Sequence, residues 1–338
     1  MESAQLSGKA VSEPREKRGI SGSTIKIIAI IAMLIDHVAA VVLGRQIMAN
    51  GLLDAAAGGE ARLMSWITDN GTLYFSYQVM RMIGRLGFPI FCFLLVEGFQ
   101  RTRNVKKYAL RLGLFALISE IPFNLAITGK IWHVGYQNVY FTLLLGLLAL
   151  CAYDFFSKCE QAEAGKDLPE GLRMLLTATG ILLPGIYPAV FVPFDSLKSR
   201  LIWGGSFCAV TALILLLYGK RKGFRSMQTA CADITVLIPL MFLAEFLYTD
   251  YSGMGVLTIT GMYLFRRRRV LSMLAGCIVL TLMSIGEIPA FLALIFIALY
   301  NGKRGLKMKY FFYIFYPAHL FLLYLLAVAM GLGNISAL

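Results

Sequence analysis

Acidic residues, cysteines and histidines are scarce in this 338-residue chain. It has 19 Asp and Glu against 32 Lys and Arg, six Cys and three His, and only 15% of its residues are charged. Soluble domains average about 25% charged residues, so the composition excludes an ordinary water-soluble enzyme. The cysteines lie in apolar runs or at one end of them, which argues against a disulfide-linked secreted module. No CxxC, HExxH, Walker or Rossmann glycine pattern occurs, so neither a metal site nor nucleotide hydrolysis is predicted.

Apolar side chains make up 58% of the sequence and gather in long runs. A bilayer core of about 30 Å needs roughly 20 mostly apolar residues in one helix. The sequence therefore predicts an all-α, polytopic integral membrane protein of eleven spans. Two regions, 252–265 and 270–300, are short and equally fit a re-entrant segment or a tight hairpin, so ten spans is the alternative. The runs lie at 24–43, 77–98, 108–127, 138–157, 174–194, 200–218, 232–249, 252–265, 270–285, 287–300 and 310–330.

The distribution of Lys and Arg between these runs predicts an orientation. With the N-terminus in the cytoplasm, 25 of the 32 basic residues fall in six cytoplasmic segments, as the positive-inside rule requires. The same distribution excludes a nucleic-acid partner, because the charges are spread over six short loops. Residues 1–20 are polar and mixed in charge, and are predicted to form a disordered cytoplasmic tail. The basic residues placed outside are Arg45, Arg62, Lys130, Lys198 and Arg200.

A layer of ionisable and amide side chains interrupts the first four predicted spans at a similar depth, in the outer half of the bilayer. Each charge there costs about 2.5–3.5 kcal/mol unless it has a partner or a function. One interpretation is structural: Arg85 would pair with Asp36, and Arg81 with Glu120. The other is catalytic, because a structural ion pair needs no histidine beside it. The layer consists of Asp36, His37, Arg81, Arg85, Glu120, Asn124, Gln137 and Asn138.

His37 is the distinctive member of this layer, because an imidazole exchanges a proton near neutral pH without a shifted pKa. Asp36 points about 100° away around the helix, so we expect it to pair with an arginine. Glu120 or an amide is then expected to orient His37. For His319, in the last span, the sequence leaves two roles open, lining a substrate path or packing.

Lys26 precedes His37 by eleven residues, at the cytoplasmic end of the same predicted helix. At 1.5 Å per residue, about 16 Å separates them along the axis. A cation at the membrane surface and a base deeper in the helix would suit a long anionic donor whose phosphates stay in the cytoplasm. Arg101 and Arg103 border the same face, although an ordinary positive-inside loop also accounts for them.

Several stretches together resemble a known family. They are 26–37 (KIIAIIAMLIDH), 84–107 (GRLGFPIFCFLLVEGFQRTRNVKK), 117–126 (LISEIPFNLA) and 137–147 (QNVYFTLLLGL), with weaker similarity at 249–251 (TDY) and 315–319 (FYPAH). These stretches resemble the TraX family, named for the conjugation protein that acetylates the N-terminus of F pilin. That family is similar in turn to membrane-bound acyltransferases that modify surface polysaccharides and heparan sulfate. Those enzymes carry a basic residue, ten intervening residues and a histidine in their first helix, a spacing that Lys26 and His37 match.

The resemblance implies transfer of an acyl group, by default acetyl, from cytoplasmic acyl-CoA to a peptide amine or glycan hydroxyl outside the bacterial cytoplasmic membrane. It implies one transmembrane domain over 21–338, in contact with membrane lipids and with its catalytic core in 24–157. His37 would act as a general base or carry the acyl group as an acyl-imidazole. Arg85, Gln137 or Asn138 would stabilise the oxyanion. The expected catalytic residues are His37, Asp36, Glu120 and Arg85, and the expected donor contacts are Lys26, Arg81, Arg101, Arg103, Gln137 and Asn138.

Two alternatives of other classes remain open. Prolines in the fifth span and midplane charges without an ATP motif also fit a secondary transporter or a flippase. Charge concentrated in the first four spans, without a counterpart in the second half, argues against an inverted-repeat carrier. A purely structural envelope protein would leave the buried layer unexplained. Acids toward the outer side would shape an acceptor pocket or pair with Lys198 and Arg200; these are Glu245, Asp250 and Glu287.

Overall fold

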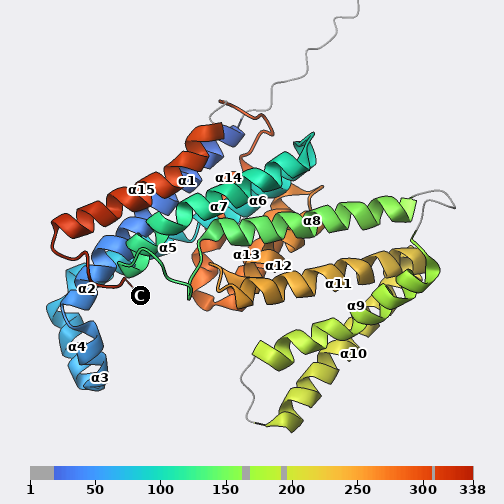
Figure 1. Ribbon diagram of the computed structural model, residues 1–338, viewed down its shortest axis with the longest axis horizontal. Coiled ribbons are helices and arrows are strands. Elements are labelled where there is room, and N and C mark those ends of the chain that lie inside the picture. The colour runs from blue at the N-terminus through green and yellow to red at the C-terminus, as the bar shows by residue number, and fades with distance from the viewer. Residues whose placement is uncertain (1–18, 162–167, 192–195, 307–308, 338) are drawn as a thin grey trace, which may run out of the picture.

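A computed structural model describes residues 19–161, 168–191, 196–306 and 309–337, and it confirms the all-α fold class (Figure 1). Within these residues, extended pairing is limited to two isolated bridges, Ile20 with Tyr300 and Gln137 with Thr249. Of the predicted tail 1–20, all but Gly19 and Ile20 lies outside the described residues. The helices are α1 (Gly22–Val38), the π-helical η1 (Ala39–Leu43), α2 (Gly44–Ala49), α3 (Leu52–Ala57), α4 (Glu60–Asp69), α5 (Gly71–Gly84), α6 (Gly87–Arg101), α7 (Val105–Thr128), α8 (Val139–Gln161), α9 (Glu170–Phe191), α10 (Leu197–Lys222), α11 (Phe224–Phe246), α12 (Ser252–Leu264), α13 (Arg269–Met283), the 3₁₀-helical η2 (Ile285–Leu292), α14 (Ala293–Ala298) and α15 (Lys309–Ala329).

In the described part of the chain, eight helical segments are long and apolar enough to cross a membrane. They correspond to the first seven predicted spans and to the last one. Two of the eight are composite: α1, η1 and α2 form one segment, Gly22–Ala49, and α5 and α6 form another, Gly71–Arg101. The multi-pass membrane architecture is therefore reached with fewer long helices than the eleven runs predicted.

The remaining predicted spans form shorter elements, namely α12, α13 and η2 with α14. With 13 and 15 residues, α12 and α13 extend about 20 and 22 Å, less than a bilayer core of about 30 Å. α12 packs against α6, α8, α11 and α13, and its Val256, Ile259 and Met262 are fully buried. Protein rather than lipid surrounds this helix. Hydropathy alone does not distinguish a helix buried in the protein interior from one that faces lipid.

Short polar signals begin and end the long helices. Ser21 accepts a hydrogen bond from the Thr24 backbone N–H at the start of α1, and Asn104 accepts one from Lys107 at the start of α7. Gly129 ends α7 in the left-handed conformation, with φ of +74°. Between Asn104 and Gly129 the chain therefore folds as one helix, α7, of 24 residues.

Basic segments that are distant in sequence meet at one end of the molecule, here named the basic end. The Arg101 guanidinium donates to the Gly302 carbonyl at 3.3 Å, and the Gly22 backbone N–H donates to the Lys303 carbonyl at 2.8 Å. Arg269 pairs with Glu97 at 3.4 Å. Figure 1 shows the start of α1 and the ends of α6 and α8 on this same side. Several of the basic segments predicted to share the cytoplasmic side thus lie close together in space.

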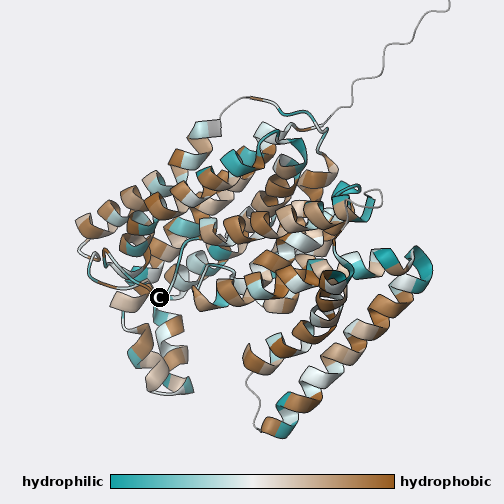
Figure 2. Ribbon diagram, turned by 45° about the vertical axis from the view of Figure 1, so that its right-hand side comes forward, coloured by the Kyte–Doolittle hydropathy of each residue, from teal (hydrophilic) through white to brown (hydrophobic). Residues whose placement is uncertain are grey.

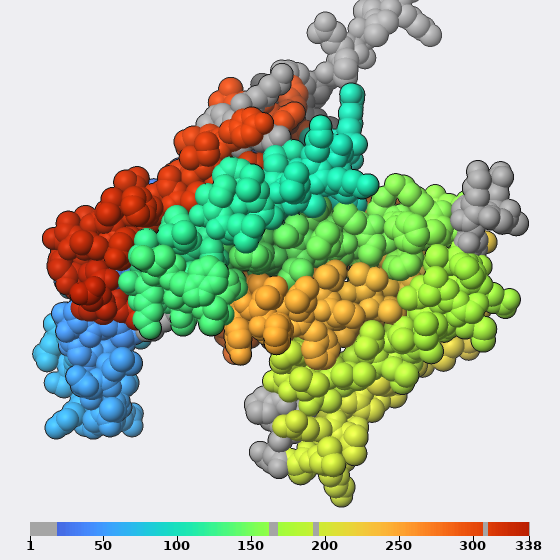
Figure 3. Space-filling view, in the orientation of Figure 1, coloured from blue at the N-terminus to red at the C-terminus, as the bar shows by residue number. Residues whose placement is uncertain are grey.

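The core lies around α1, which packs against α5, α6 and α15, while α15 also packs on α7. Ile25, Ile90, Leu147 and Leu320 are fully buried there. By contrast, α9 and α10 pack chiefly on each other and on α11, and project from the body in Figure 3. Figure 2 shows many hydrophobic residues along these helices, and few of them are buried, as expected for segments that face lipid.

Arg45 in α2 is fully buried, although the sequence places it in an outer segment. Its guanidinium donates four hydrogen bonds of 2.8 to 2.9 Å to backbone carbonyls. Two acceptors, Leu125 and Ala126, belong to the last turn of α7, and two, Leu332 and Gly333, follow α15. The planar fork of arginine suits such a multidentate arrangement, so one side chain joins two helix ends.

Candidate functional site

Two imidazoles, from His37 and His319, form the centre of the candidate site. His37 lies in the last turn of α1, and His319 lies in α15, which runs beside α1 (Figure 1). His37 Nδ1 is 2.6 Å from His319 Nε2, and the rings stack with centroids 4.9 Å apart. The sequence predicted Glu120 or an amide as the group that orients His37. That prediction is wrong, because α15 brings His319 into this position.

A further contact determines how protons are distributed in the neutral histidine pair. His319 Nδ1 lies 2.7 Å from the carbonyl oxygen of Phe315, which can only accept, so His319 Nδ1 carries a proton. A neutral imidazole has one N–H, so His319 Nε2 accepts and His37 Nδ1 donates. His37 Nε2 is then unprotonated. The pair therefore presents one free lone pair, which a base or a nucleophile needs.

Two departures from regular α-helix lie beside the pair. The π-helical η1 begins two residues after His37, and such turns occur frequently at functional sites. On the neighbouring segment, α5 ends at Gly84 and α6 begins at Gly87. A Cβ atom on Gly84 would lie 2.1 Å from Asp36 Oδ1, so α5 approaches α1 this closely because residue 84 has no side chain.

Ion pairs engage both arginines of the buried layer, with partners that differ from those predicted. Arg81 Nη1 lies 2.6 Å from Asp36 Oδ2, and Arg85 Nη1 lies 2.8 Å from Glu287 Oε1. Both predicted pairs, Asp36 with Arg85 and Glu120 with Arg81, are therefore wrong. The cause is the helix break: Arg85 caps α5 instead of continuing it, so it leaves the face that carries Arg81 and meets η2.

Glu120 and Asn138 make a separate contact between α7 and the start of α8. Glu120 Oε2 accepts from Asn138 Nδ2 at 2.6 Å, and the same nitrogen donates to the Ala116 carbonyl at 2.8 Å. Gln137 donates its side-chain amide to the Val134 carbonyl at 3.0 Å. Among the described residues, none of these hydrogen bonds reaches His37. The catalytic role of Glu120 and the donor contacts of the two amides stay predictions.

Residues 249–251 close another side of the charged layer. The Tyr136 hydroxyl donates to Asp250 Oδ1 at 2.8 Å, and the Thr142 hydroxyl donates to the Asp250 carbonyl. Tyr251 stacks on Phe88 with ring centroids 3.6 Å apart. The acids Asp250 and Glu287 thus engage groups inside the bundle, and Glu287 pairs with an arginine that the sequence did not propose for it.

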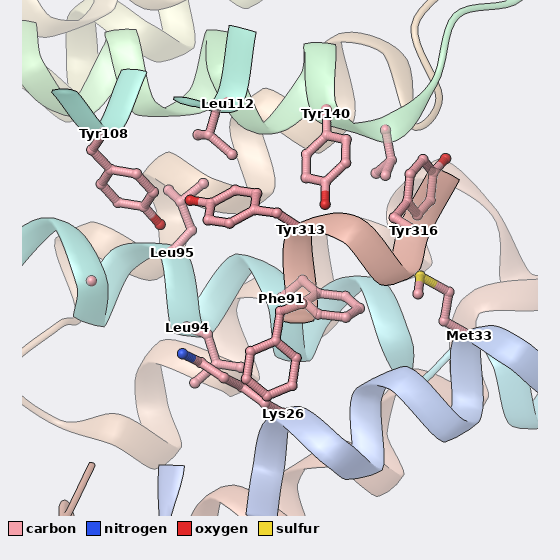
Figure 4. A pocket seen from close by; sticks show the side chains of 13 residues that line it. Lys26, Met33, Phe91, Leu94, Leu95, Tyr108, Leu112, Tyr140, Tyr313 and Tyr316 are labelled. Atoms are coloured by element: carbon pink, nitrogen blue, oxygen red, sulfur yellow. The ribbon is translucent and has the colours of Figure 1, made fainter. Parts of the chain in front are cut away.

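A cavity of about 190 Å³, here named the aromatic tunnel, lies between Lys26 of α1 and Tyr316 of α15 (Figure 4). Met33, one helical turn before His37, lines it, and so does Tyr316, whose ring centroid is 6.0 Å from that of His37. Lys26 lines the opposite part of the cavity, toward the start of α1. The other lining residues are Phe91, Leu94, Leu95, Gly98, Tyr108, Leu112, Val139, Tyr140, Phe312 and Tyr313.

A cavity of about 390 Å³, here named the basic mouth, adjoins the tunnel. Lys26 lines both cavities, with its Nζ 5.2 Å from the centroid of the Phe312 ring. In the described part of the chain, no carboxylate lies within ion-pair distance of Lys26. Arg101 and Arg103 also line the mouth, whereas Arg81 lies deeper, on Asp36. The residues common to both cavities are Lys26, Leu94, Gly98, Tyr108 and Tyr313.

Glu97 organises the wall of the basic mouth. Its carboxylate accepts from the Tyr300 hydroxyl at 2.7 Å and pairs with Arg101 at 3.3 Å. Burial, followed by the hydrogen bond to Glu97, raises the pKa of Tyr300 to about 12, so the hydroxyl stays protonated and donates at neutral pH. Arg269 approaches the same carboxylate at 3.4 Å. One acid thereby positions two guanidinium groups at the entrance.

Comparison with known proteins gives the family. The model of the TraX protein family matches residues 21–187 and 205–327. The chain belongs to the TraX family. A relative described as the probable fimbrial assembly protein FimC, serogroup H1, from Dichelobacter nodosus is 28% identical over 320 residues, covering 90% of this chain and 94% of that protein. No solved structure matches the chain.

In this TraX protein, the residues predicted from sequence fall into four places, one of which is the separate group of Glu120, Gln137 and Asn138. His37 pairs with His319 next to Tyr316, which lines the tunnel, and Lys26, Arg101 and Arg103 lie together at the mouth. Asp36, Arg81 and Arg85 form the ion-paired layer beside His37. Sequence reasoning missed the pairing role of His319, whose only signal was the weaker similarity at 315–319.

Proposed function

We propose that this TraX-family protein is a membrane-bound acyltransferase that uses acyl-CoA, by default acetyl-CoA, from the cytoplasmic side. Its acceptor would be a peptide amine or a glycan hydroxyl on the other side of the bacterial cytoplasmic membrane. One observation carries this proposal: the basic mouth adjoins the aromatic tunnel, and the far lining of that tunnel, Met33 and Tyr316, lies beside His37. The basic end faces the cytoplasm in this arrangement.

The dimensions of the route fit a coenzyme A thioester. The pantetheine arm between diphosphate and sulfur has about as many backbone bonds as four amino-acid residues, so it extends ~14 Å. Lys26 and His37 lie about 16 Å apart along α1. Phosphates held by Lys26, Arg101 and Arg103 would therefore place the thioester near Tyr316 and His37. Ammonium and guanidinium groups are suited to phosphate oxygens, and the apolar lining suits the arm.

The chemistry follows from the proton distribution of the histidine pair. His37 Nε2 takes the proton of the acceptor amine or hydroxyl as the acceptor attacks the thioester carbonyl carbon. The new C–N or C–O bond forms, the C–S bond breaks, and the proton passes from His37 to the leaving thiolate, which gives CoA. His319 accepts from His37 Nδ1–H throughout and stabilises the transient imidazolium. Tyr140, whose hydroxyl points into the tunnel in Figure 4, offers a hydrogen bond to the carbonyl oxygen.

The acceptor would approach from the end opposite the basic end. Asp36 and Arg81 keep 18% and 26% of their side-chain surface exposed beside His37, so this layer is not sealed. The TraX family and the fimbrial assembly relative both support a pilin-type peptide amine as the acceptor. A glycan hydroxyl is the chemical alternative that the same base would activate.

The first test measures thioester turnover by the full-length protein in nanodiscs of neutral lipid. Acetyl-labelled acetyl-CoA is supplied with a short peptide bearing a free N-terminal amine, and CoA thiol release and peptide acetylation are followed. We expect His37→Ala to lower turnover by about 10²–10⁴-fold, the usual contribution of a general base. His133→Ala is the matched control, because His133 lies in the loop between α7 and α8. Equal turnover in the folded His37→Ala variant would overturn the assignment.

A second measurement separates transfer from transport. Proteoliposomes that move an envelope precursor across the bilayer without releasing CoA would support the secondary transporter or flippase instead. Acceptor identity in the cell is then sought by mass spectrometry of envelope components from a deletion strain. Loss of an acetyl group from one component would support the transferase.

A further inference from the structure

We propose that the groove lined by Arg266, Arg267, Arg268 and Arg269 binds a phosphomonoester, the 3′-phosphate of the donor's nucleotide. This inference rests on the proposed function and assigns a site for the end of the donor farthest from the reacting carbonyl. The groove, here named the arginine groove, has a volume of about 930 Å³.

The arginine groove adjoins the basic mouth. Glu97, Arg101 and Tyr300 line both cavities. A ligand whose diphosphate lies in the mouth can therefore extend past Glu97 into the groove. In a coenzyme A molecule, the next group in that direction is the nucleotide with its terminal phosphate.

The N-terminus of α13 opens into the groove. This 15-residue helix begins at Arg269 after an extended N-cap, Arg268, which makes no side-chain capping bond. The first backbone N–H groups of a helix have no partner within the helix and carry partial positive charge. Val270 and Leu271, in that first turn, line the groove. Backbone donors at such a terminus bind phosphate well.

Two of the four arginines interact with side chains of the protein, and the other two are available to bind a ligand. Arg266 stacks on Tyr263, with its guanidinium carbon 3.9 Å from the ring centroid, and Arg269 pairs with Glu97. Arg267 and Arg268 are exposed and, among the described residues, make no ion pair and no side-chain hydrogen bond. With Arg101, five guanidinium groups face a single carboxylate. This excess suits a phosphomonoester, which carries about −1.5 to −2 charge near neutral pH.

An anionic lipid headgroup shares the phosphate chemistry, because arginines at a cytoplasmic surface also attract lipid. The shared lining with the basic mouth favours the donor. The test therefore uses neutral phosphatidylcholine nanodiscs for the donor and vesicles containing phosphatidylglycerol for the lipid.

The experiment compares calorimetric binding of CoA and 3′-dephospho-CoA to the full-length protein. We expect the wild type to bind CoA about tenfold more tightly, as one charge-assisted contact allows. The variant R267A/R268A should bind the two ligands equally, by losing affinity for CoA alone. R221A/K222A removes two exposed charges at the end of α10 and is the matched control, which should keep the difference.

Each contrary outcome has a separate meaning. Equal binding of both ligands by the wild type, with thioester turnover intact, would overturn the groove assignment and leave the proposed function standing. Absence of binding and of turnover in folded wild type would overturn the proposed function, and the groove assignment with it. If R267A/R268A keeps its CoA preference but loses binding to phosphatidylglycerol vesicles, the groove binds lipid and the assignment to the donor is wrong.

Discussion

His37 and His319 are 282 positions apart in the chain, yet their facing ring nitrogens lie 2.6 Å from each other. The contact joins the first and the last of the long apolar helices. His319 also hydrogen-bonds the Phe315 carbonyl, so α15 fixes both the position and the tautomer of the imidazole on α1. The chemistry proposed for His37 thus depends on a residue from the other end of the sequence.

Removing His319 should lower kcat without weakening donor binding. In His319→Ala, the Nδ1–H of His37 loses its acceptor, so the productive tautomer and the imidazolium are no longer stabilised. We expect kcat to fall about 100-fold, while the KM for acetyl-CoA stays within twofold. Steady-state CoA release measures both constants. Partial rescue by added imidazole would distinguish this positioning role from general unfolding, and full activity in the variant would contradict it.

Lys26→Gln should weaken donor binding and spare the chemical step. Lys26 lines both the mouth and the tunnel, where its ammonium would contact a phosphate of the donor. Loss of one charge-assisted contact should raise the KM for acetyl-CoA about 10-fold or more, with kcat largely kept. Lys130→Gln, at an exposed position in the loop after α7, is the control. An unchanged KM in Lys26→Gln would remove this residue from the donor site.

Gly84→Ala should disturb the charged layer through a single methyl group. Its Cβ would lie 2.1 Å from Asp36 Oδ1 and 2.3 Å from Asp36 Cβ, so α5 must move away from α1. Overpacking of this kind typically costs 1–3 kcal/mol of stability, and turnover should fall because the Asp36–Arg81 pair is displaced. Gly71→Ala in the same helix is the control, because its Cβ would meet no atom within 4 Å. Thermal unfolding and turnover that match between the two variants would refute this account.

Arg45→Met should lower the stability of the fold. The substitution leaves four backbone carbonyls without their guanidinium donor in a fully buried site. We expect a loss of about 3 kcal/mol or more, seen as a lower melting temperature in detergent. Arg62→Met is the matched control, because Arg62 is exposed in α4. If both variants have the same melting temperature, the four hydrogen bonds contribute little to the stability of the fold.

The parts of the site that lie on one helix follow from sequence, and those that join helices do not. Lys26 and His37 both lie on α1, so their separation follows from the rise per residue of an α-helix. The partners of Arg81 and Arg85 depend on the break after Gly84, which periodicity alone does not locate. His319 meets His37 only through the packing of α15 on α1. Likewise, the apolar composition of α12 and α13 predicts membrane spans. Both helices are too short to cross a bilayer core, and they are apolar because they pack against neighbouring helices.

Arg45 also determines the axial register of the histidine pair. It belongs to the same continuous helical segment as His37, and it holds Leu332 and Gly333, which follow the helix that carries His319. A slide of α15 by one residue would move His319 by about 1.5 Å along the axis, enough to break a hydrogen bond of 2.6 Å. The distance between the two imidazole rings is therefore set in part by backbone carbonyls thirteen and fourteen residues beyond His319.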